Sequence, residues 1–169
     1  MHIPKIFVRL TRSLYDEVRR DLARPHNFAL ERVGFMTVRL GNTGHEPLLV
    51  LADSYTPVAD EHYVNDSNVG ARINSAAIRT AMQQAIDRDC GIFHVHEHPF
   101  IGKPRLSRVD SAELPQVVAG TRNATPSHPH GLLLLSEDSG TAFVLLPDSD
   151  CLFQVERLSV VGFPTEIFQ

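Results

Sequence analysis

Cysteine is scarce in this chain of 169 residues, in which only Cys90 and Cys151 occur. Two distant thiols cannot form the disulfide framework of a small secreted domain, and they lack the short spacing of cysteine pairs that bind zinc. We therefore expect both side chains to be ordinary buried or half-buried thiols.

Long apolar runs and an excess of basic residues are also missing. Nowhere do about 18 apolar residues follow one another, as a membrane-spanning helix requires, and the N-terminus lacks the apolar core of a secretory signal. The formal net charge is -4, whereas binding to nucleic-acid phosphates calls for a basic stripe. We expect a cytoplasmic protein whose partners include neither a membrane nor a nucleic acid.

The remaining composition is that of an ordinary globular protein. Hydrophobic residues make up 43% of the chain and charged residues 21%, which are near the averages for folded domains. A chain of this length can bury on the order of 70% of the surface that its unfolded form exposes. We therefore expect one domain over residues 1–169.

Apolar residues recur at helical spacing in three segments, residues 13–22, 74–91 and 108–120. Ser13 stands just before the first apolar residue of the first segment, and Asn74 is placed to cap the second. The pattern predicts three helices.

Alternating or continuous apolar runs between turn signals predict the strands. These segments are 31–40 with a turn at 41–44, 48–58, 61–64, 91–98, 131–135, 141–146 and one or two strands within 152–161. Residues 121–130 are expected to form a polar loop, and 136–140 a hairpin turn. Strands interleaved with helices predict an α/β or α+β sandwich.

Histidines cluster in the segment Gly91 to His98. Because successive side chains of a strand face opposite ways, His94, His96 and His98 share one face. Zinc accepts imidazole nitrogen and carboxylate oxygen, and a catalytic zinc site commonly has three protein ligands and one water. His96, His98 and Asp110 form a candidate set. Two alternatives remain: the three histidines occupy solvent-exposed polar positions, or one of them is a hydrogen-bonded histidine of the core.

The segment that follows places Asp110 within reach of the histidines. Pro99 ends the strand, and Ser107 is positioned to cap a helix that begins at Arg108. Asp110 then lies in the first helical turn. Ser107 can serve the site as well as the cap only if the strand end and the helix start are adjacent.

Together these residues resemble a known signature. His96-Glu97-His98-Pro99 followed by Ser107-x-x-Asp110 is similar to the H-x-H-P…S-x-x-D motif of the JAMM metallopeptidases, the MPN-plus or JAB domain family. The family also has an upstream glutamate on an early strand, which Glu31 matches, and the resemblance runs from residue 31 to about residue 147. One departure is the segment between His98 and Ser107, which has eight residues instead of the family's seven and needs a bulge.

The resemblance implies a fold, a cofactor and an activity. The fold would be a JAB/MPN-like curved mixed β-sheet flanked by helices. One zinc ion per chain would be held by His96, His98 and Asp110, with Glu31 as general base and Ser107 stabilising the oxyanion. Family members hydrolyse peptide or isopeptide bonds after the C-terminal glycines of ubiquitin-like proteins. Small prokaryotic members act beside the activating or conjugating enzymes of these modifiers, and here segments 64–71 and 102–106 are candidates to dock the substrate tail.

Several alternatives stay open or are excluded. The main one is a metal-free MPN scaffold that binds partner subunits, and the DNA-repair-linked RadC-like branch is disfavoured by the acidic balance. A zinc deaminase needs P-C-x-x-C, and a gluzincin needs H-E-x-x-H; both motifs are missing. His94 either contacts and supports a metal ligand without binding the metal itself, or is an ordinary strand residue. His128 and His130 are a candidate for a second metal site, but a mobile polar loop is the preferred interpretation of the segment that contains them.

Overall fold

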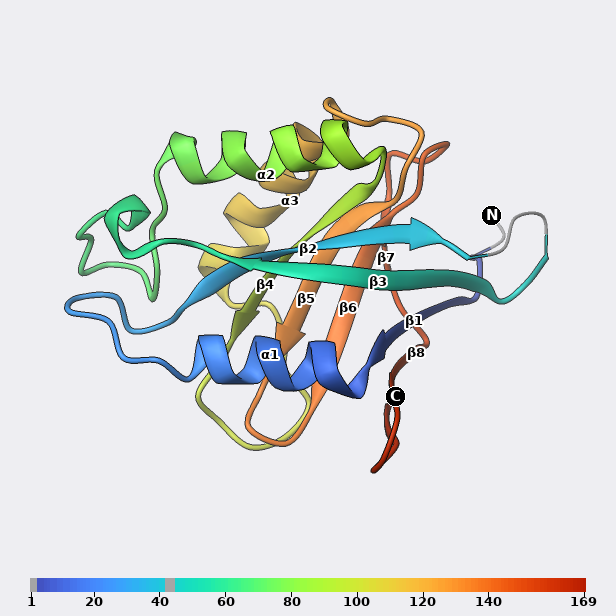
Figure 1. The fold of residues 1–169 in the computed structure, drawn as a ribbon, viewed down its shortest axis with the longest axis horizontal. Coiled ribbons are helices and arrows are strands. Elements are labelled where there is room, and N and C mark those ends of the chain that lie inside the picture. Colours follow the sequence, from blue (N-terminus) through green and yellow to red (C-terminus); the bar gives the residue numbers. More distant parts are fainter. Residues whose placement is uncertain (1–2, 42–44) are drawn as a thin grey trace.

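A nine-stranded sheet and three α-helices form the part of the chain that the computed structural model describes, residues 3–41 and 45–169 (Figure 1). The strands are β1 (Ile6–Thr11), β2 (Val33–Leu40), β3 (Leu48–Pro57), β4 (Gly91–Glu97), β5 (His130–Leu135), β6 (Gly140–Leu145), β7 (Leu152–Gln154), β8 (Arg157–Val161) and β9 (Glu166–Phe168). The helices are α1 (Arg12–Leu22), α2 (Ser75–Arg88) and α3 (Arg108–Arg122), with a 3-10 turn at Asp60–His62. The fold is α+β, as predicted.

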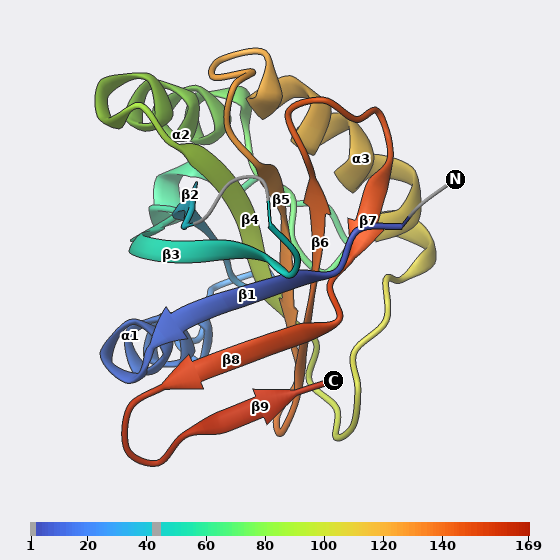
Figure 2. The ribbon, with the colours of Figure 1, turned by 90° about the vertical axis from the view of Figure 1, so that its right-hand side faces the viewer.

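The sheet is mixed and curled. Its strand order is β7-β6-β5-β4-β2-β3-β1-β8-β9, in which β1 pairs in parallel with β3 and β8, and β4 pairs in parallel with β5. Figure 2 shows β1, β8 and β9 running across the direction of β5 and β6. The curl brings β8 close to β6, so that a Cβ on Gly140 would lie 2.9 Å from Leu158. A curved mixed sheet, which the sequence analysis gave as an implication of the motif resemblance, is therefore present.

The helices cover both faces of the sheet. Apolar residues of α1 pack with Phe93 and Val95 of β4 in the largest core cluster. On the other face, α2 packs against Phe35 and Ile92, and α3 packs against Leu132. Because side chains alternate along β4, the histidines that neighbour Phe93 and Val95 lie on the face covered by α2 and α3.

Some predicted boundaries are wrong. Helix α1 begins before Ser13, because the Thr11 side chain accepts a hydrogen bond from the Leu14 backbone N–H at 3.2 Å and caps the helix. The predicted strand at 61–64 is a 3-10 turn followed by a single bridge between Tyr63 and Ile73. Of the turn predicted at 41–44, residues 42–44 lie outside the described residues. Strands β1 and β9 were not predicted.

The polar loop predicted at 121–130 is present over residues 123–129, but both of its predicted ends are wrong. Helix α3 continues to Arg122, and His130 is fully buried at the start of β5. Its Nδ1 accepts a hydrogen bond from the Ile92 N–H at 3.3 Å, and its Nε2 lies 3.0 Å from the Thr125 carbonyl oxygen. His130 is thus a satisfied core histidine, and its neighbour His128 instead contacts an aspartate, Asp89, at 2.8 Å.

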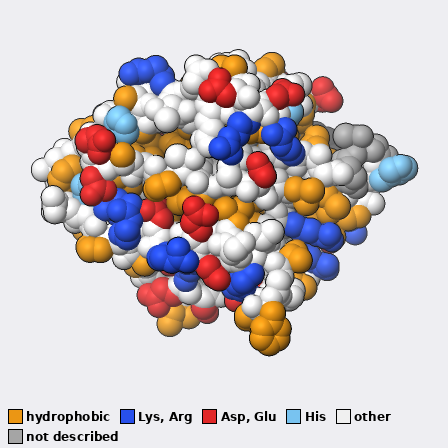
Figure 3. Space-filling model, viewed as in Figure 1, with side chains coloured by type: hydrophobic (Ala, Val, Ile, Leu, Met, Phe, Trp, Pro, Cys, Tyr) orange, Lys and Arg blue, Asp and Glu red, His pale blue; other side chains and the backbone are white. Residues whose placement is uncertain are grey.

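Other expectations concern the thiols and the surface. Cys90 is buried as expected, but Cys151 is exposed. Among the described residues, no helix is long and apolar enough to cross a bilayer. On the face drawn in Figure 3, acidic and basic side chains are interspersed and neither sign dominates.

Candidate metal centre

The end of β4 and the first turn of α3 bring three candidate ligands together. His96 lies on β4, His98 follows directly after the strand, and Asp110 is the third residue of α3. Ser107 caps the helix: its Oγ accepts from the Asp110 N–H at 3.0 Å, and Asp110 Oδ2 accepts from the Ser107 N–H at 2.7 Å. This reciprocal pair orients the Asp110 carboxylate toward the end of β4.

The distances between the donor atoms fit a zinc ion. The Nε2 atoms of His96 and His98 are 3.2 Å apart. Asp110 Oδ1 lies 3.4 Å from His96 Nε2, and Asp110 Oδ2 lies 3.2 Å from His98 Nε2. Tetrahedral zinc with bonds of about 2.0–2.1 Å separates its ligand atoms by about 3.3–3.4 Å. Each of these separations is close to that value, with the two Asp110 distances made by its two different oxygens, so the three side chains lie together as a candidate ligand set.

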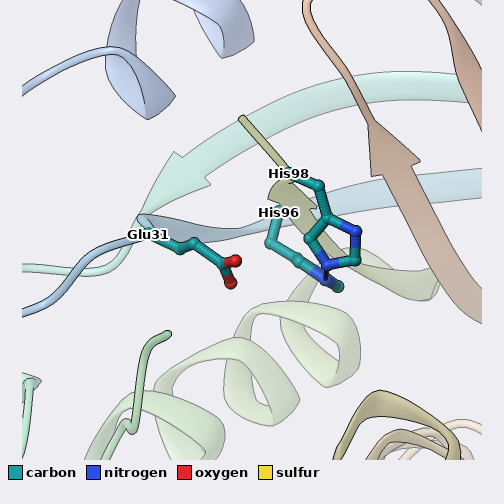
Figure 4. A group of neighbouring side chains, drawn as sticks. All are labelled: Glu31, His96 and His98. Atoms are coloured by element: carbon teal, nitrogen blue, oxygen red, sulfur yellow. Dashed lines mark hydrogen bonds between the residues drawn. The ribbon is translucent and has the colours of Figure 1, made fainter. Parts of the chain in front are cut away.

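Glu31 completes the group from a different part of the chain. Its carboxylate and the ring nitrogens of His96 and His98 offer ligand atoms that all lie within 4.8 Å of one another (Figure 4). Glu31 was predicted at the start of a strand, but β2 begins only at Val33. The reason is that its backbone N–H bonds to the Gly70 carbonyl oxygen at 3.1 Å instead of to a neighbouring strand.

The surroundings shift the acidity of the carboxyl groups. Burial raises the pKa of Glu31, an effect that His96 and His98 partly oppose. Burial also disfavours the charge of Asp110, but hydrogen bonds from His96, His98 and Ser107 outweigh it and hold the pKa of Asp110 far below its usual range. Asp110 is thus a charged ligand candidate, and Glu31 is a stronger base than an exposed glutamate.

The histidines differ in their environments. The hydrogen bond from His98 to Asp110 raises the pKa of His98, whereas burial lowers the pKa of His94 to about 3. His94 lies ring edge to ring face beside His96, with centroids 5.4 Å apart. Among the described residues, Nδ1 of His94 and Nδ1 of His96 have no hydrogen-bond partner. No hydrogen bond in the described structure therefore joins His94 to a candidate ligand.

A small pocket opens beside the candidate ligands. It measures about 60 Å³ and is lined by Glu31, Val33, Ala71, His94, His96, Val109, Asp110, Glu113 and Leu114. That volume has room for a few water molecules. Of the two segments predicted to dock a substrate tail, 64–71 reaches the pocket through Ala71.

Large apolar side chains are exposed next to the site. Leu30, which precedes Glu31, is 84% exposed, and Ile101 in the loop after His98 is 75% exposed. Phe100 is also exposed, and its ring lies 5.9 Å from that of His98 between centroids. Phe100 thus presents an apolar surface beside a candidate ligand, and exposed apolar patches are typical of surfaces that contact another macromolecule.

The sequence analysis missed residues that hold Glu31 in place. A Cβ on Gly70 would lie 2.5 Å from the Glu31 carboxylate, so only glycine leaves room for it. Arg32 is 3% exposed and donates to Asp60 Oδ1 at 2.7 Å and to the Pro25 carbonyl oxygen at 2.8 Å. The sequence does hold a signal for Arg32, because an arginine directly before an apolar segment indicates a charged side chain that is buried and paired. Nothing in the sequence connects Gly70 with Glu31.

Comparison with known proteins does not place the chain in a family: no family model matches it, and no curated protein does. A functional proposal therefore depends on the motif and on the arrangement of the side chains described above.

Proposed function

We propose that this protein is a zinc-dependent peptidase or isopeptidase of the JAMM type that its motif resembles. The observation that carries the proposal is the convergence of two imidazoles and one carboxylate, His96, His98 and Asp110, at separations of 3.2 to 3.4 Å. Three protein ligands leave the fourth position of a tetrahedral site to water, as in catalytic zinc sites. When bound, zinc acts as a Lewis acid: it lowers the pKa of a water molecule and polarises a carbonyl group.

The side chains of this chain perform the proton transfers. Glu31 takes a proton from the attacking water and passes it to the departing amine, and its raised pKa suits both directions of transfer. Ser107 Oγ accepts a hydrogen bond from the Asp110 N–H, and its hydroxyl hydrogen, which faces the Asp110 carboxylate, can turn to another acceptor. That hydrogen is donated to the substrate carbonyl oxygen as it gains negative charge.

The proposed substrate is the C-terminal tail of a ubiquitin-like protein, in a precursor or in a conjugate. Two features support a protein substrate. The small pocket beside His96 opens to the surface, where a substrate chain can approach the candidate ligands, and the exposed Leu30 and Ile101 offer apolar contacts to a folded partner. Activating or conjugating enzymes of the same modifier are further proposed partners.

The proposal is tested with one substitution and one probe. Purified protein should contain about one zinc ion per chain, and it should cleave ubiquitin whose C-terminal Gly-Gly is joined to the side-chain amine of a fluorescent lysine. Glu31→Gln removes the base but none of the three proposed ligands. We expect it to keep its zinc, measured by elemental analysis, and to lose cleavage by about two orders of magnitude or more.

The matched control is Glu61→Gln, which changes an exposed glutamate of the 3-10 turn and should leave both readouts unchanged. Cleavage that persists in Glu31→Gln would remove Glu31 from the role of base. A wild-type chain that takes up no zinc would overturn the proposal and leave the metal-free scaffold as the better interpretation.

A further inference from the structure

The end of β4 is held from the face opposite the candidate ligands. Because side chains alternate along the strand, Glu97 points toward α1, whereas His96 and His98 point toward α3. Arg19 of α1 donates from Nη1 to Glu97 Oε1 at 2.8 Å. Both side chains are half-buried, with 24% and 19% of their surface exposed, so water screens this ion pair less than a surface pair.

The same guanidinium also binds the turn between β5 and β6. Nη1 of Arg19 donates to the Ser136 carbonyl oxygen, and Nη2 donates to the Glu137 carbonyl oxygen, each at 2.5 Å. The planar fork of arginine can serve several acceptors at once, which a lysine ammonium on a flexible stem does less rigidly. One side chain therefore joins α1, the end of β4 and this turn; we refer to Arg19, Glu97 and the two carbonyl groups as the Arg19 latch.

The turn in the latch also holds the loop that follows β4. The His98 N–H donates to the Leu135 carbonyl oxygen at 2.9 Å, and the Glu137 N–H donates to the Phe100 carbonyl oxygen at 3.0 Å. Further along, the Ser136 hydroxyl donates to the Gly102 carbonyl oxygen at 2.6 Å. The backbone from His98 to Gly102 is thus fastened to the turn, and the turn is fastened to Arg19.

We propose that Arg19 is a positioning residue for the candidate metal centre, an inference that rests on the proposed function. His98 lies beyond the last residue of β4, where the chain keeps β5 on one side but has no β2 partner on the other, because the pairing with β2 stops at His96. A twist of the strand end would move His98 Nε2 relative to His96 Nε2 and the Asp110 carboxylate, which are only 3.2 to 3.4 Å apart. The latch opposes this twist from the other side of the sheet, without contacting zinc or substrate.

The test is the zinc affinity of Arg19→Ala, measured by competition with a chromogenic chelator. Loss of a group that orients metal ligands commonly weakens binding by about 10- to 100-fold, and we expect a loss in this range. The visible absorption spectrum of the Co²⁺-loaded variant should also change, because it reports the geometry of the ligands. A purely structural role would lower the urea midpoint of the metal-free protein but leave affinity and spectrum as in the wild type.

The matched control is Arg20→Ala, since Arg20 is the exposed neighbour on α1 and takes no part in the latch. It removes the same charge and should bind zinc like the wild type.

A second pair of variants tests the inference if Arg19→Ala does not fold. Glu97→Gln keeps an oxygen that accepts from Arg19 and should bind zinc within a few-fold of wild type, whereas Glu97→Leu should weaken binding more.

The outcomes separate the two proposals. If the wild type binds zinc and Arg19→Ala binds it equally well, or Glu97→Leu does so where Arg19→Ala is unfolded, the inference about Arg19 is overturned and the proposed function stands. If the wild type binds no zinc, the proposed function itself fails, and the inference fails with it.

Discussion

Gly70 has a direct influence on the proposed base. Its carbonyl oxygen accepts hydrogen bonds from the backbone N–H groups of Leu30 and Glu31, at 2.8 and 3.1 Å. Its missing side chain leaves the space that the Glu31 carboxylate occupies. The position of Glu31 therefore depends on one residue of a loop that is distant in the sequence.

Gly70→Ala should move the base without changing the ligands. The added Cβ, 2.5 Å from the carboxylate, must displace Glu31, and a misplacement of about 1 Å can lower a rate by about 100-fold. We expect cleavage to fall by about 10- to 100-fold while zinc content stays at the wild-type value. Gly120→Ala is the control, because nothing lies within 4 Å of a Cβ at that helical position. Equal activity of the two variants would show that Glu31 does not need this space.

At the scale of elements, the start of α3 serves two purposes. Ser107 caps the helix and also supplies the hydroxyl that the proposed mechanism uses. Ser107→Ala should lower the free energy of unfolding by about 1 kcal/mol and should reduce turnover by about 100- to 1,000-fold. Urea unfolding and steady-state cleavage measure the two effects separately.

The control for this prediction is the cap of another helix. Asn74 caps α2 by accepting from the Ala76 and Ala77 N–H groups at 3.0 and 3.2 Å. Asn74→Ala should lower stability by a similar amount but leave turnover unchanged. If the two variants lose the same small share of activity, Ser107 acts only as a cap.

The elements also show which features a sequence can predict. The period-2 pattern of β4 and the cap at Ser107 are local, so the sequence analysis placed His96 and Asp110 on the elements that carry them, whereas His98 lies one residue beyond the end of β4. Strand β1 was missed although it alternates buried and exposed residues, because a short N-terminal segment without turn signals gives little evidence of its partners. Its pairing with β3 and β8 is non-local, as are the contacts of Gly70 with Glu31 and of Arg19 with Glu97.

At the scale of the whole molecule, the site lies where a parallel unit joins the antiparallel part of the sheet. Helix α3 connects the parallel strands β4 and β5, and such connections place functional side chains at the carboxyl ends of the strands. Antiparallel pairing of β2 with β4 brings Val33 opposite His96, and this register carries Glu31, two residues before Val33, to the same edge. The topology thus joins three distant segments, which no single sequence window contains.

The stability of the whole molecule should depend on pH through its buried histidines. Burial lowers the pKa of His130 in the folded state, whereas an unfolded histidine titrates near 6.5. As the pH falls, the unfolded chain therefore takes up this proton first, and the contribution of His130 to stability is complete above about pH 6.5 and is lost below it. His94 acts in the same direction, while His98, whose pKa is raised, acts in the opposite one.

His130→Asn isolates the contribution of one histidine, because asparagine offers an oxygen to the Ile92 N–H but does not titrate. We expect the difference in unfolding free energy between wild type and variant to be constant above about pH 7. It should shrink below pH 6.5, by at most about 1.4 kcal/mol per pH unit. Urea unfolding with a chelator present measures this difference without interference from bound metal. A difference that stays constant down to pH 5 would mean that His130 accepts a proton in the folded protein as readily as in the unfolded chain.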